Sequence, residues 1–258
     1  MEAYGWEWFI ERFEKLSKID LTAYKRPQME RRINSFMRTA NAANYKDFID
    51  LLNKDQQLYK KFLEHITINV SEFFRNINHW QIMEKEIVPL LLKEKKSLKI
   101  WSAGCSTGEE PYSLAMMLRE NGWSLAEPIY ATDIDKDVLS KASLGVYSDK
   151  AMEGVPSNIK NKYFKSHPEG FEVNDDIKKM VKFQQHNLLR DNFPKNYDLI
   201  LCRNVVIYFT EETKEDLYKR FTEALRPKGI LFIGSTEQIF QAREIGLNSV
   251  ATFFYQKD

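Results

Sequence analysis

Apolar residues in the first part of the chain recur three or four positions apart, which places them on one face of a helix. Four such groups follow one another, and no alternating strand pattern lies between them. We therefore predict a small module made only of helices. The apolar positions that define the four groups are Trp6, Phe9, Ile10, Phe13 and Leu16; Met29, Ile33, Phe36 and Met37; Phe48, Leu51 and Leu52; and Leu58, Phe62, Leu63 and Ile66.

From about residue 98 the pattern changes to short apolar runs that alternate with amphipathic segments. The apolar runs predict buried strands, and the segments between them predict helices. Repeated strand–helix units indicate a parallel, doubly wound sheet, and ligands of such sheets lie at the carboxyl ends of the strands. Strands are predicted at 98–103, 128–132, 197–202, 230–233 and 250–255, and helices at 112–120, 136–143 and 212–225.

Residues from about 145 to 180 interrupt this alternation. Short, half-polar runs at 171–173 and 180–183 flank a polar stretch at 174–176, and Asn and Asp are typical turn residues. We predict a small antiparallel insertion before the next main strand. Two interpretations of the insertion stay open, a decorated loop and a recognition element.

The composition is that of an ordinary folded chain. Of its 258 residues 43% are hydrophobic, and 38 Lys and Arg balance 37 Asp and Glu to a net charge of +1. This balance argues against wrapping nucleic acid, and no apolar run approaches the roughly 20 residues of a membrane span. The first residues lack a signal-peptide pattern. We expect a soluble, cytoplasmic protein with a helical domain and linker over 1–75 and a larger domain over 76–258.

Cysteines and histidines offer no metal or disulfide pattern. Cys105 and Cys202 are the only two cysteines, the four histidines are scattered, and neither CxxC nor HExxH occurs. We expect no metal site. Cys105 lies in a glycine-rich turn without an indicated histidine partner, so we interpret it as a packing residue and not as a nucleophile.

The glycine-bounded turn at 104–108 links a predicted strand to a helix, where backbone can approach a ligand. It matches neither GxGxxG nor GxxxxGK[ST], which argues against dinucleotides and nucleoside triphosphates. Asp133 ends the next predicted strand, the position of an acid that binds ribose hydroxyls in such folds. It is equally interpreted as a helix N-cap, a role that Asp135 could take instead. Together these features favour S-adenosylmethionine.

The second predicted helix carries an uneven charge. Arg31 and Arg38 lie opposite its apolar face, and Arg32 lies at the border. This surface is either an ordinary solvated face or a docking surface for an acidic partner.

Six segments of the sequence form a series of motifs. They are TINVSEFFR at 67–75, WSAGCSTGEEPYS at 101–113, HNLL at 186–189, CRNVVIYF at 202–209, GSTE at 234–237 and TFFY at 252–255. In content and order they resemble the motifs of the CheR family, the chemotaxis receptor methyltransferases. The resemblance spans nearly the whole chain.

The resemblance implies an α/β fold. Its parts are a Rossmann-like class I SAM-dependent methyltransferase domain, a small all-α N-terminal domain and an inserted antiparallel β-subdomain. It also implies methyl transfer from S-adenosylmethionine to glutamate side chains of chemoreceptor cytoplasmic domains, with S-adenosylhomocysteine as product. The enzyme would be cytoplasmic and recruited to membrane receptor arrays, with neither nucleic acid binding nor direct membrane insertion.

The same resemblance implies roles for single residues. Ser71 stands where many relatives carry Thr, which preserves the hydroxyl, and Glu109 is a weaker candidate than Glu110 for binding the methionine end of the cofactor. Arg75 and Tyr208 would face the reacting groups. Arg31, Arg32 and Arg38 would dock the receptor. The implied cofactor contacts are Asn69, Ser71, Arg75, Glu110, Asp133, Asn187, Leu188, Arg203 and Asn204.

Two other functions remain as alternatives. One is a class I methyltransferase that acts on a different acceptor, such as a small acid or a non-receptor protein. The other is an adaptor that binds the cofactor and docks to signalling proteins without turnover, although intact Arg75 and Tyr208 favour an enzyme. A nucleic-acid methyltransferase is disfavoured by the near-zero net charge.

Overall fold

The computed structural model describes residues 4–67 and 69–258 and divides into two compact units. The helical unit comprises the described residues up to Asn69 together with Tyr208–Asp216. The sheet unit comprises Val70–Ile207 and Leu217–Asp258. In the described part of the chain, no helix combines the length and the apolar character that crossing a membrane requires.

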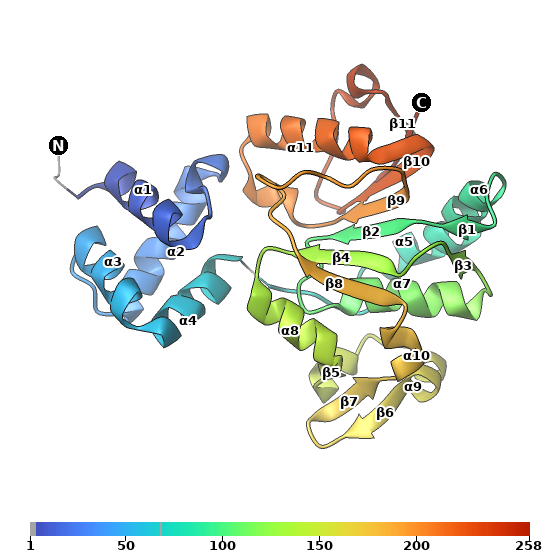
Figure 1. Cartoon of the computed structure of the whole chain (residues 1–258), viewed down its shortest axis with the longest axis horizontal. Helices are drawn as coiled ribbons and strands as arrows, with labels where there is room; N and C mark the ends of the chain where they lie inside the picture. The colour runs from blue at the N-terminus through green and yellow to red at the C-terminus, as the bar shows by residue number, and fades with distance from the viewer. Residues whose placement is uncertain (1–3, 68) are drawn as a thin grey trace. The chain divides into compact units, whose positions relative to one another are not determined.

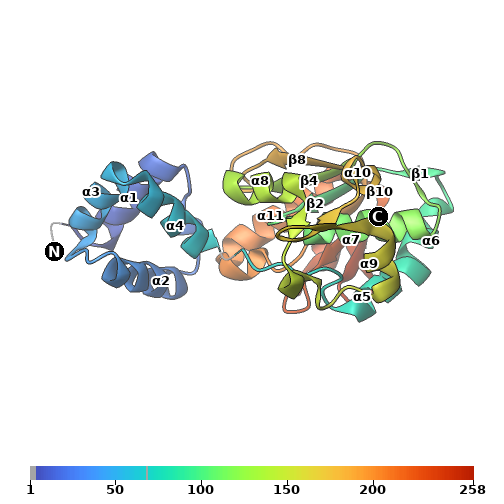
Figure 2. The same ribbon diagram turned by 90° about the horizontal axis from the view of Figure 1, so that it is seen from below.

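The helical unit contains the four helices that the periodicity predicts (Figures 1 and 2). Four phenylalanines are fully buried between them, and the ring centroids of Phe48 and Phe62 lie 4.8 Å apart in an edge-on arrangement. Such pairs add to the burial energy that holds short helices together. The elements are α1 (Trp6–Ser17), η1 (Leu21–Ala23), α2 (Arg26–Thr39), α3 (Tyr45–Lys54) and α4 (Gln56–Thr67).

A segment from late in the chain completes the helical unit. The backbone N–H of Lys25 donates to the Tyr208 carbonyl at 2.9 Å, and that of Thr210 donates to the Ala23 carbonyl at 2.9 Å. The Phe209 ring packs edge-on against Tyr24, with centroids 4.8 Å apart. These contacts explain why Tyr208–Asp216 belongs to the helical unit.

The sheet unit is built on a seven-stranded sheet in the order β11-β12-β10-β9-β2-β4-β8. Its strands are parallel except for β12, which is antiparallel to both β10 and β11. The central strands β2 and β9 are buried at every position, as expected when helices cover both faces. The strands are β2 (Ile100–Ala103), β4 (Ile129–Asp133), β8 (Val181–Gln185), β9 (Tyr197–Cys202), β10 (Leu225–Ile233), β11 (Leu247–Ala251) and β12 (Phe254–Lys257).

Helices α7 and α11 pack on opposite faces of this sheet. Side chains alternate along β2. The Trp101 ring packs against Phe221 of α11, with ring centroids 5.5 Å apart, whereas the hydroxyl of the next residue, Ser102, donates to Glu110 of α7. The helical elements of the unit are α5 (Ile77–Ile82), the π-helical η2 (Met83–Ile87), α6 (Val88–Leu92), α7 (Glu109–Glu120), α8 (Lys136–Leu144), η4 (Val206–Tyr208), α11 (Glu211–Ala224) and η5 (Ala242–Ile245); η4 and α11 continue into the helical unit.

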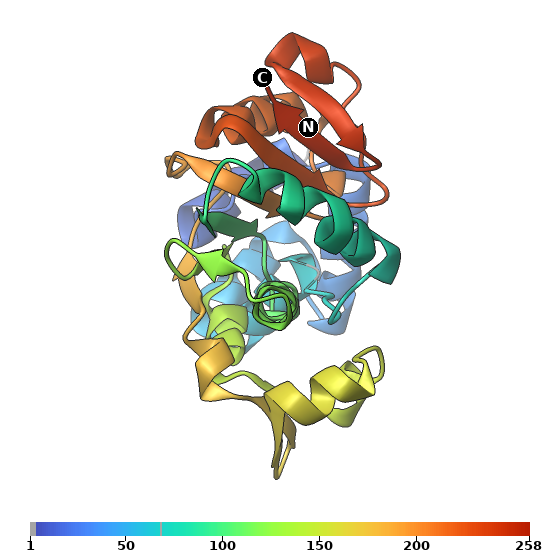
Figure 3. The same cartoon turned by 90° about the vertical axis from the view of Figure 1, so that its right-hand side faces the viewer.

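A separate antiparallel sheet, in the order β5-β7-β6, forms the predicted insertion (Figures 1 and 3). Lys162 and the Tyr163 hydroxyl both bond to the Glu120 carboxylate at the end of α7, which ties the insertion to the central layers. The elements are β5 (Val146–Tyr147), η3 (Asp149–Met152), α9 (Ser157–Tyr163), β6 (Phe164–His167), β7 (Gly170–Val173) and α10 (Asp175–Lys178); two short strands, β1 (Ser97–Leu98) and β3 (Ser124–Leu125), pair elsewhere.

Two strand predictions are wrong in detail. The run at 180–183 belongs to β8, which pairs in parallel with β4 in the central sheet and not within the insertion. As an edge strand it is largely exposed, so its half-polar pattern imitates a strand of a small antiparallel sheet. The predicted strand at 250–255 is a hairpin of β11 and β12 that turns at Phe253, where φ is +69°. The helical stretch from α5 to α6 was not predicted.

Candidate functional site

The turn after β2 forms a tight backbone cradle at the carboxyl edge of the sheet. Gly104 has a φ of +75°, and a Cβ there would lie 2.4 Å from the Val205 side chain. Gly108, with φ +94°, is the N-cap of α7. Only glycine satisfies both the left-handed backbone and the close approach at residue 104. Within the described chain, the buried Oγ of Ser106 in this turn has no hydrogen-bond partner.

Asp133 lies at the end of β4, beside the same turn. Its carboxylate accepts the backbone N–H groups of Ser106 at 2.9 Å and Asp135 at 3.0 Å. Burial raises the pKa of Asp133, and these N–H groups oppose the rise. The N-cap of α8 is Asp135, which accepts from Asp137 at 2.9 Å, so the alternative role proposed for Asp133 falls to its neighbour. The Asp133 carboxylate keeps lone pairs for a ligand.

Glu110 and Arg203 form a buried ion pair between α7 and the end of β9. Arg203 Nη1 lies 3.2 Å from Glu110 Oε2, and only 2% and 14% of the two side chains are exposed. Ser102 of β2 donates to the other carboxylate oxygen at 2.8 Å. The Arg203 guanidinium also lies over the Phe232 ring of β10, 4.6 Å from its centroid. The pair therefore places a carboxylate at the strand ends while the charge of Arg203 compensates its buried negative charge.

Glu109, the other acid of this motif, binds the chain that precedes the sheet. Its carboxylate accepts from the Thr107 hydroxyl at 2.9 and 2.7 Å and from Ser71. Burial raises the pKa of Glu109, and the Thr107 and Ser71 bonds oppose the rise. The backbone N–H of Phe74 donates to Ser113 of α7 at 2.9 Å. Glu109 thus holds Ser71, and α7 anchors the segment that carries it.

Arg75 ends this segment with a fixed backbone and a half-exposed side chain. Its carbonyl accepts from Arg203 Nη2 at 2.9 Å and from the Trp80 indole at 3.0 Å. Its own guanidinium makes a long contact of 3.5 Å to the Val70 carbonyl. The backbone of Arg75 is therefore held in place, whereas its guanidinium is little constrained.

Glu237 is a buried carboxylate that the sequence analysis did not select. It accepts the backbone N–H of Gly234, and it lies beside the N–H groups of Asn204, Val206 and Ile207, at the start of the loop and η4 that follow β9. Burial raises the pKa of Glu237, and the N–H groups oppose the rise. The GSTE motif was the only signal for Glu237 in the sequence. Its contact with the chain some thirty positions earlier left no signal there.

Asn204 itself has a left-handed backbone, with φ +59°. Its Oδ1 is buried and has no hydrogen-bond partner in the part of the chain that the structure describes. A buried amide oxygen without a partner is costly, so this atom is available to a ligand.

Asn187 and Leu188 follow β8 at the same edge. The preceding backbone N–H, that of His186, donates to the Asp133 carbonyl at 2.9 Å. The Asn187 side chain accepts from the backbone of Leu189 at 2.9 Å, and Leu188 is buried. Their backbone is therefore tied to the end of β4, where Asp133 lies.

The remaining predicted residues belong to the helical unit. Asn69 donates to the Thr67 hydroxyl at 2.9 Å, and Tyr208 ends η4. Arg31 and Arg38 are exposed on α2, whereas Arg32 is half-buried, as their helical positions predict. The Arg32 guanidinium donates to the His65 carbonyl, and the His65 ring contacts the Arg32 carbonyl at 3.2 Å. Arg32 thus joins α2 to α4.

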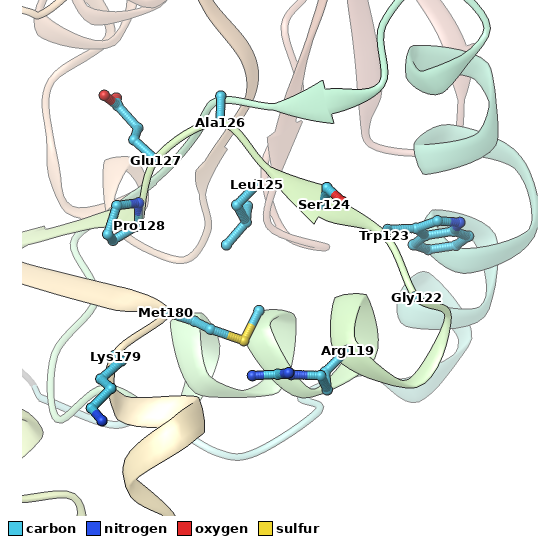
Figure 4. Close-up of a pocket in the computed structure, with 10 residues that line it drawn as sticks. All are labelled: Arg119, Gly122, Trp123, Ser124, Leu125, Ala126, Glu127, Pro128, Lys179 and Met180. Atoms are coloured by element: carbon cyan, nitrogen blue, oxygen red, sulfur yellow. The ribbon is translucent and has the colours of Figure 1, made fainter.

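A buried cysteine and a surface groove lie outside the proposed chemistry of the site. Cys105 is buried, and burial raises the pKa of its thiol far above the ordinary value, so it stays protonated and packs. An open groove of about 550 Å³ lies before the amino ends of β4 and β8, away from the carboxyl edge (Figure 4). It is lined by Arg119, Gly122, Trp123, Ser124, Leu125, Ala126, Glu127, Pro128, Lys179 and Met180.

Comparison with known families accounts for both units. Residues 69–252 match "CheR methyltransferase, SAM binding domain", and residues 5–67 match "CheR methyltransferase, all-alpha domain". The chain belongs to the CheR methyltransferase family. The protein named "Chemotaxis protein methyltransferase" of Listeria monocytogenes is 42% identical over 240 residues, covering 93% of this chain and 92% of the relative. Those of Borreliella burgdorferi (36%; 86% and 83% covered) and Salmonella typhimurium (30%; 93% and 86% covered) carry the same name.

S-adenosylmethionine fits the carboxyl edge of this CheR-family sheet. The edge offers two carboxylates, of Glu110 and Asp133, and two buried oxygens, of Ser106 and Asn204, that find no partner among the described residues. Acceptors of this kind suit a ligand with an ammonium group and ribose hydroxyls. The chain is a SAM-dependent methyltransferase, and its cofactor supplies a methyl group activated by the adjacent sulfonium.

Proposed function

We propose that this enzyme transfers a methyl group from S-adenosylmethionine to glutamate side chains of chemoreceptor cytoplasmic domains, forming methyl esters in chemotactic adaptation. The observation that carries the proposal is the tandem match of an all-alpha and a SAM-binding CheR domain over 5–67 and 69–252. Relatives named chemotaxis protein methyltransferase align with 93% and 86% of this chain. The enzyme would act in the cytoplasm, at receptor arrays.

In the proposed cofactor site, Glu110 binds the ammonium group of the methionine end and Asp133 binds the ribose. Asn187 and Leu188 flank the adenine, and Arg203 with Asn204 completes the pocket. These roles are supported by the ion pair of Glu110 and by the buried Oδ1 of Asn204, which has no hydrogen-bond partner among the described residues.

The segment at 69–75 supplies the other proposed cofactor contacts, from Asn69, Ser71 and Arg75. The bond from Ser71 to Glu109 and the fixed backbone of Arg75 support the last two. Asn69 lies in the helical unit, and its role rests on the family motif.

Esterification of a glutamate requires no general base. A carboxylate with an ordinary pKa of about 4.3 is already ionised and nucleophilic at neutral pH. The enzyme must therefore align the carboxylate with the methyl group and exclude water. We propose that the little-constrained Arg75 guanidinium holds one carboxylate oxygen while the other attacks, and that the Tyr208 hydroxyl orients the reacting groups. Tyr208 carries this role on the family motif alone.

Receptor docking is proposed for the exposed face of α2. Arg31 and Arg38 are free to meet acidic side chains, whereas Arg32 also stabilises the contact of α2 with α4. We expect Arg31→Ala/Arg38→Ala to lower receptor methylation several-fold at physiological salt while cofactor affinity stays unchanged. A control that removes two exposed cations elsewhere, Lys15→Ala/Lys54→Ala, should keep the original rate. Equal rates for the two double variants would refute docking through α2.

The decisive test is transfer of a radiolabelled methyl group from S-adenosylmethionine to a receptor cytoplasmic fragment, followed by mild base. Base releases methanol from carboxyl esters but not from methylated nitrogen. Label that base removes, and that disappears when receptor glutamates are changed to alanine, supports the proposal. Cofactor binding without transfer to the receptor contradicts it and favours an adaptor or another acceptor.

A further inference from the structure

The inserted sheet reaches the cofactor turn through one side chain. Tyr147 lies on β5 and pairs with Phe171 of β7. Its side chain points out of the inserted sheet, only 6% of the residue is exposed, and its hydroxyl donates to the Thr107 carbonyl at 2.7 Å. Thr107 lies between the two glycines of the turn after β2. The insertion therefore contacts the backbone of the turn itself.

From Thr107 the hydrogen bonds continue to the segment that precedes the sheet. The Thr107 hydroxyl donates to Glu109, and Ser71 bonds to the same carboxylate. Thr107 therefore links two sets of hydrogen bonds: its carbonyl accepts from Tyr147, and its hydroxyl donates to the carboxylate that also binds Ser71. Loss of the Tyr147 bond would leave the Thr107 backbone less firmly held, and with it the Thr107 hydroxyl that partners the buried Glu109 carboxylate.

The Tyr147 ring reinforces this arrangement. It packs edge-on against Phe73, with centroids 4.8 Å apart, and against Tyr112 of α7 at 6.4 Å. A Cβ at Gly108 would lie 3.1 Å from the Tyr147 hydroxyl, so the turn and the tyrosine fit closely. Burial raises the pKa of Tyr147 well above its ordinary value, and the nearby Glu109 carboxylate raises it further. The hydroxyl therefore stays a donor at neutral pH.

We propose that Tyr147 is a positioning residue that couples the inserted sheet to cofactor affinity. By fixing the Thr107 carbonyl it orders the turn, Glu109 and Ser71 before the cofactor arrives. Less of this ordering then opposes binding, which is the usual benefit of preorganisation. The proposal concerns cofactor binding and is independent of the methyl acceptor.

Tyr163 provides a matched comparison. It also lies in the insertion and bonds through its hydroxyl to α7, but at Glu120, the far end of the helix. Tyr147→Phe and Tyr163→Phe each delete one hydroxyl that ties the insertion to the central layers. Only the first deletion touches the cofactor turn.

The test measures the Kd of S-adenosylhomocysteine by calorimetry, with thermal unfolding as the measure of folding. We expect Tyr147→Phe to raise the Kd about three- to tenfold, the range of one net hydrogen bond, while Tyr163→Phe leaves it within about twofold. In turnover, Tyr147→Phe should raise the KM for S-adenosylmethionine more than it lowers kcat. An unchanged Kd, or equal increases in both variants, would overturn the proposal.

A second variant, at Thr107, tests whether Tyr147 acts through the Thr107–Glu109 network. Thr107→Val keeps the backbone carbonyl but removes the hydroxyl that reaches Glu109. If Tyr147 acts through this network, the double variant Tyr147→Phe/Thr107→Val should raise the Kd by less than the product of the two single effects. Strictly multiplicative effects would show that the two hydroxyls act independently and would contradict the coupling.

Discussion

The ion pair between Arg203 and Glu110 joins two segments that are far apart in the sequence. Both side chains are almost fully buried, at 2% and 14% exposure. Arg203 also donates to the Arg75 carbonyl and the Asn76 side chain, and Glu110 also accepts from Ser102. Each partner therefore keeps some hydrogen bonds when the other is replaced, and a double-mutant cycle can isolate the energy of the pair.

The structure sets the expected magnitudes. Breaking a buried pair costs about 3–5 kcal/mol, and for Arg203→Met we expect the lower end, about 3 kcal/mol of the free energy of unfolding, because Glu110 keeps Ser102. For Glu110→Gln we expect about 1.5 kcal/mol, since the shape stays and the hydrogen bond loses its charge. We expect the double variant to cost about 3 kcal/mol, which corresponds to a coupling of about 1.5 kcal/mol.

Urea denaturation of the four proteins gives the free energies by linear extrapolation. Because the chain has two units, amide hydrogen exchange in β2 and β9 should show that the loss lies in the sheet unit. A coupling below about 0.5 kcal/mol would mean that the two residues contribute independently. That result would refute the argument that each charge compensates the burial of the other.

Three further outcomes are expected. Glu237→Gln, which removes the carboxylate facing the loop after β9, should raise the Kd of S-adenosylhomocysteine about tenfold in calorimetry; an unchanged Kd would show that the loop holds itself. Gly104→Ala should destabilise the protein to urea by roughly 2 kcal/mol more than Gly122→Ala, because both glycines have positive φ but only Gly104 faces a side chain at 2.4 Å; equal losses would argue against the cradle. Burial lowers the pKa of His186, so its contribution to the free energy of unfolding is complete above about pH 6.5 and is lost as the pH falls below that value. His186→Phe should therefore flatten the dependence of the unfolding free energy on pH below about 6.5. An undiminished pH dependence would contradict the assignment of this loss to His186.

Local sequence pattern was sufficient for much of this protein. The four helices around Phe48 and Phe62, the strand–helix alternation and the glycine turn were all predicted, because helix faces, buried strands and left-handed turns leave short-range signals. The exposure of Arg31 and Arg38 and the partial burial of Arg32 followed from helical spacing in the same way. The cofactor class followed from the turn and the strand-end acid.

Tertiary structure decided which distant groups meet. No local pattern indicates that Glu237 faces the loop after β9, or that Tyr147 of the insertion bonds to Thr107 forty positions earlier. The membership of β8 in the central sheet was likewise misjudged, since an exposed edge strand has the same half-polar pattern in either sheet. Hydrogen bonds between remote segments depend on how the layers pack, and packing is a property of the whole fold that short-range periodicity does not contain.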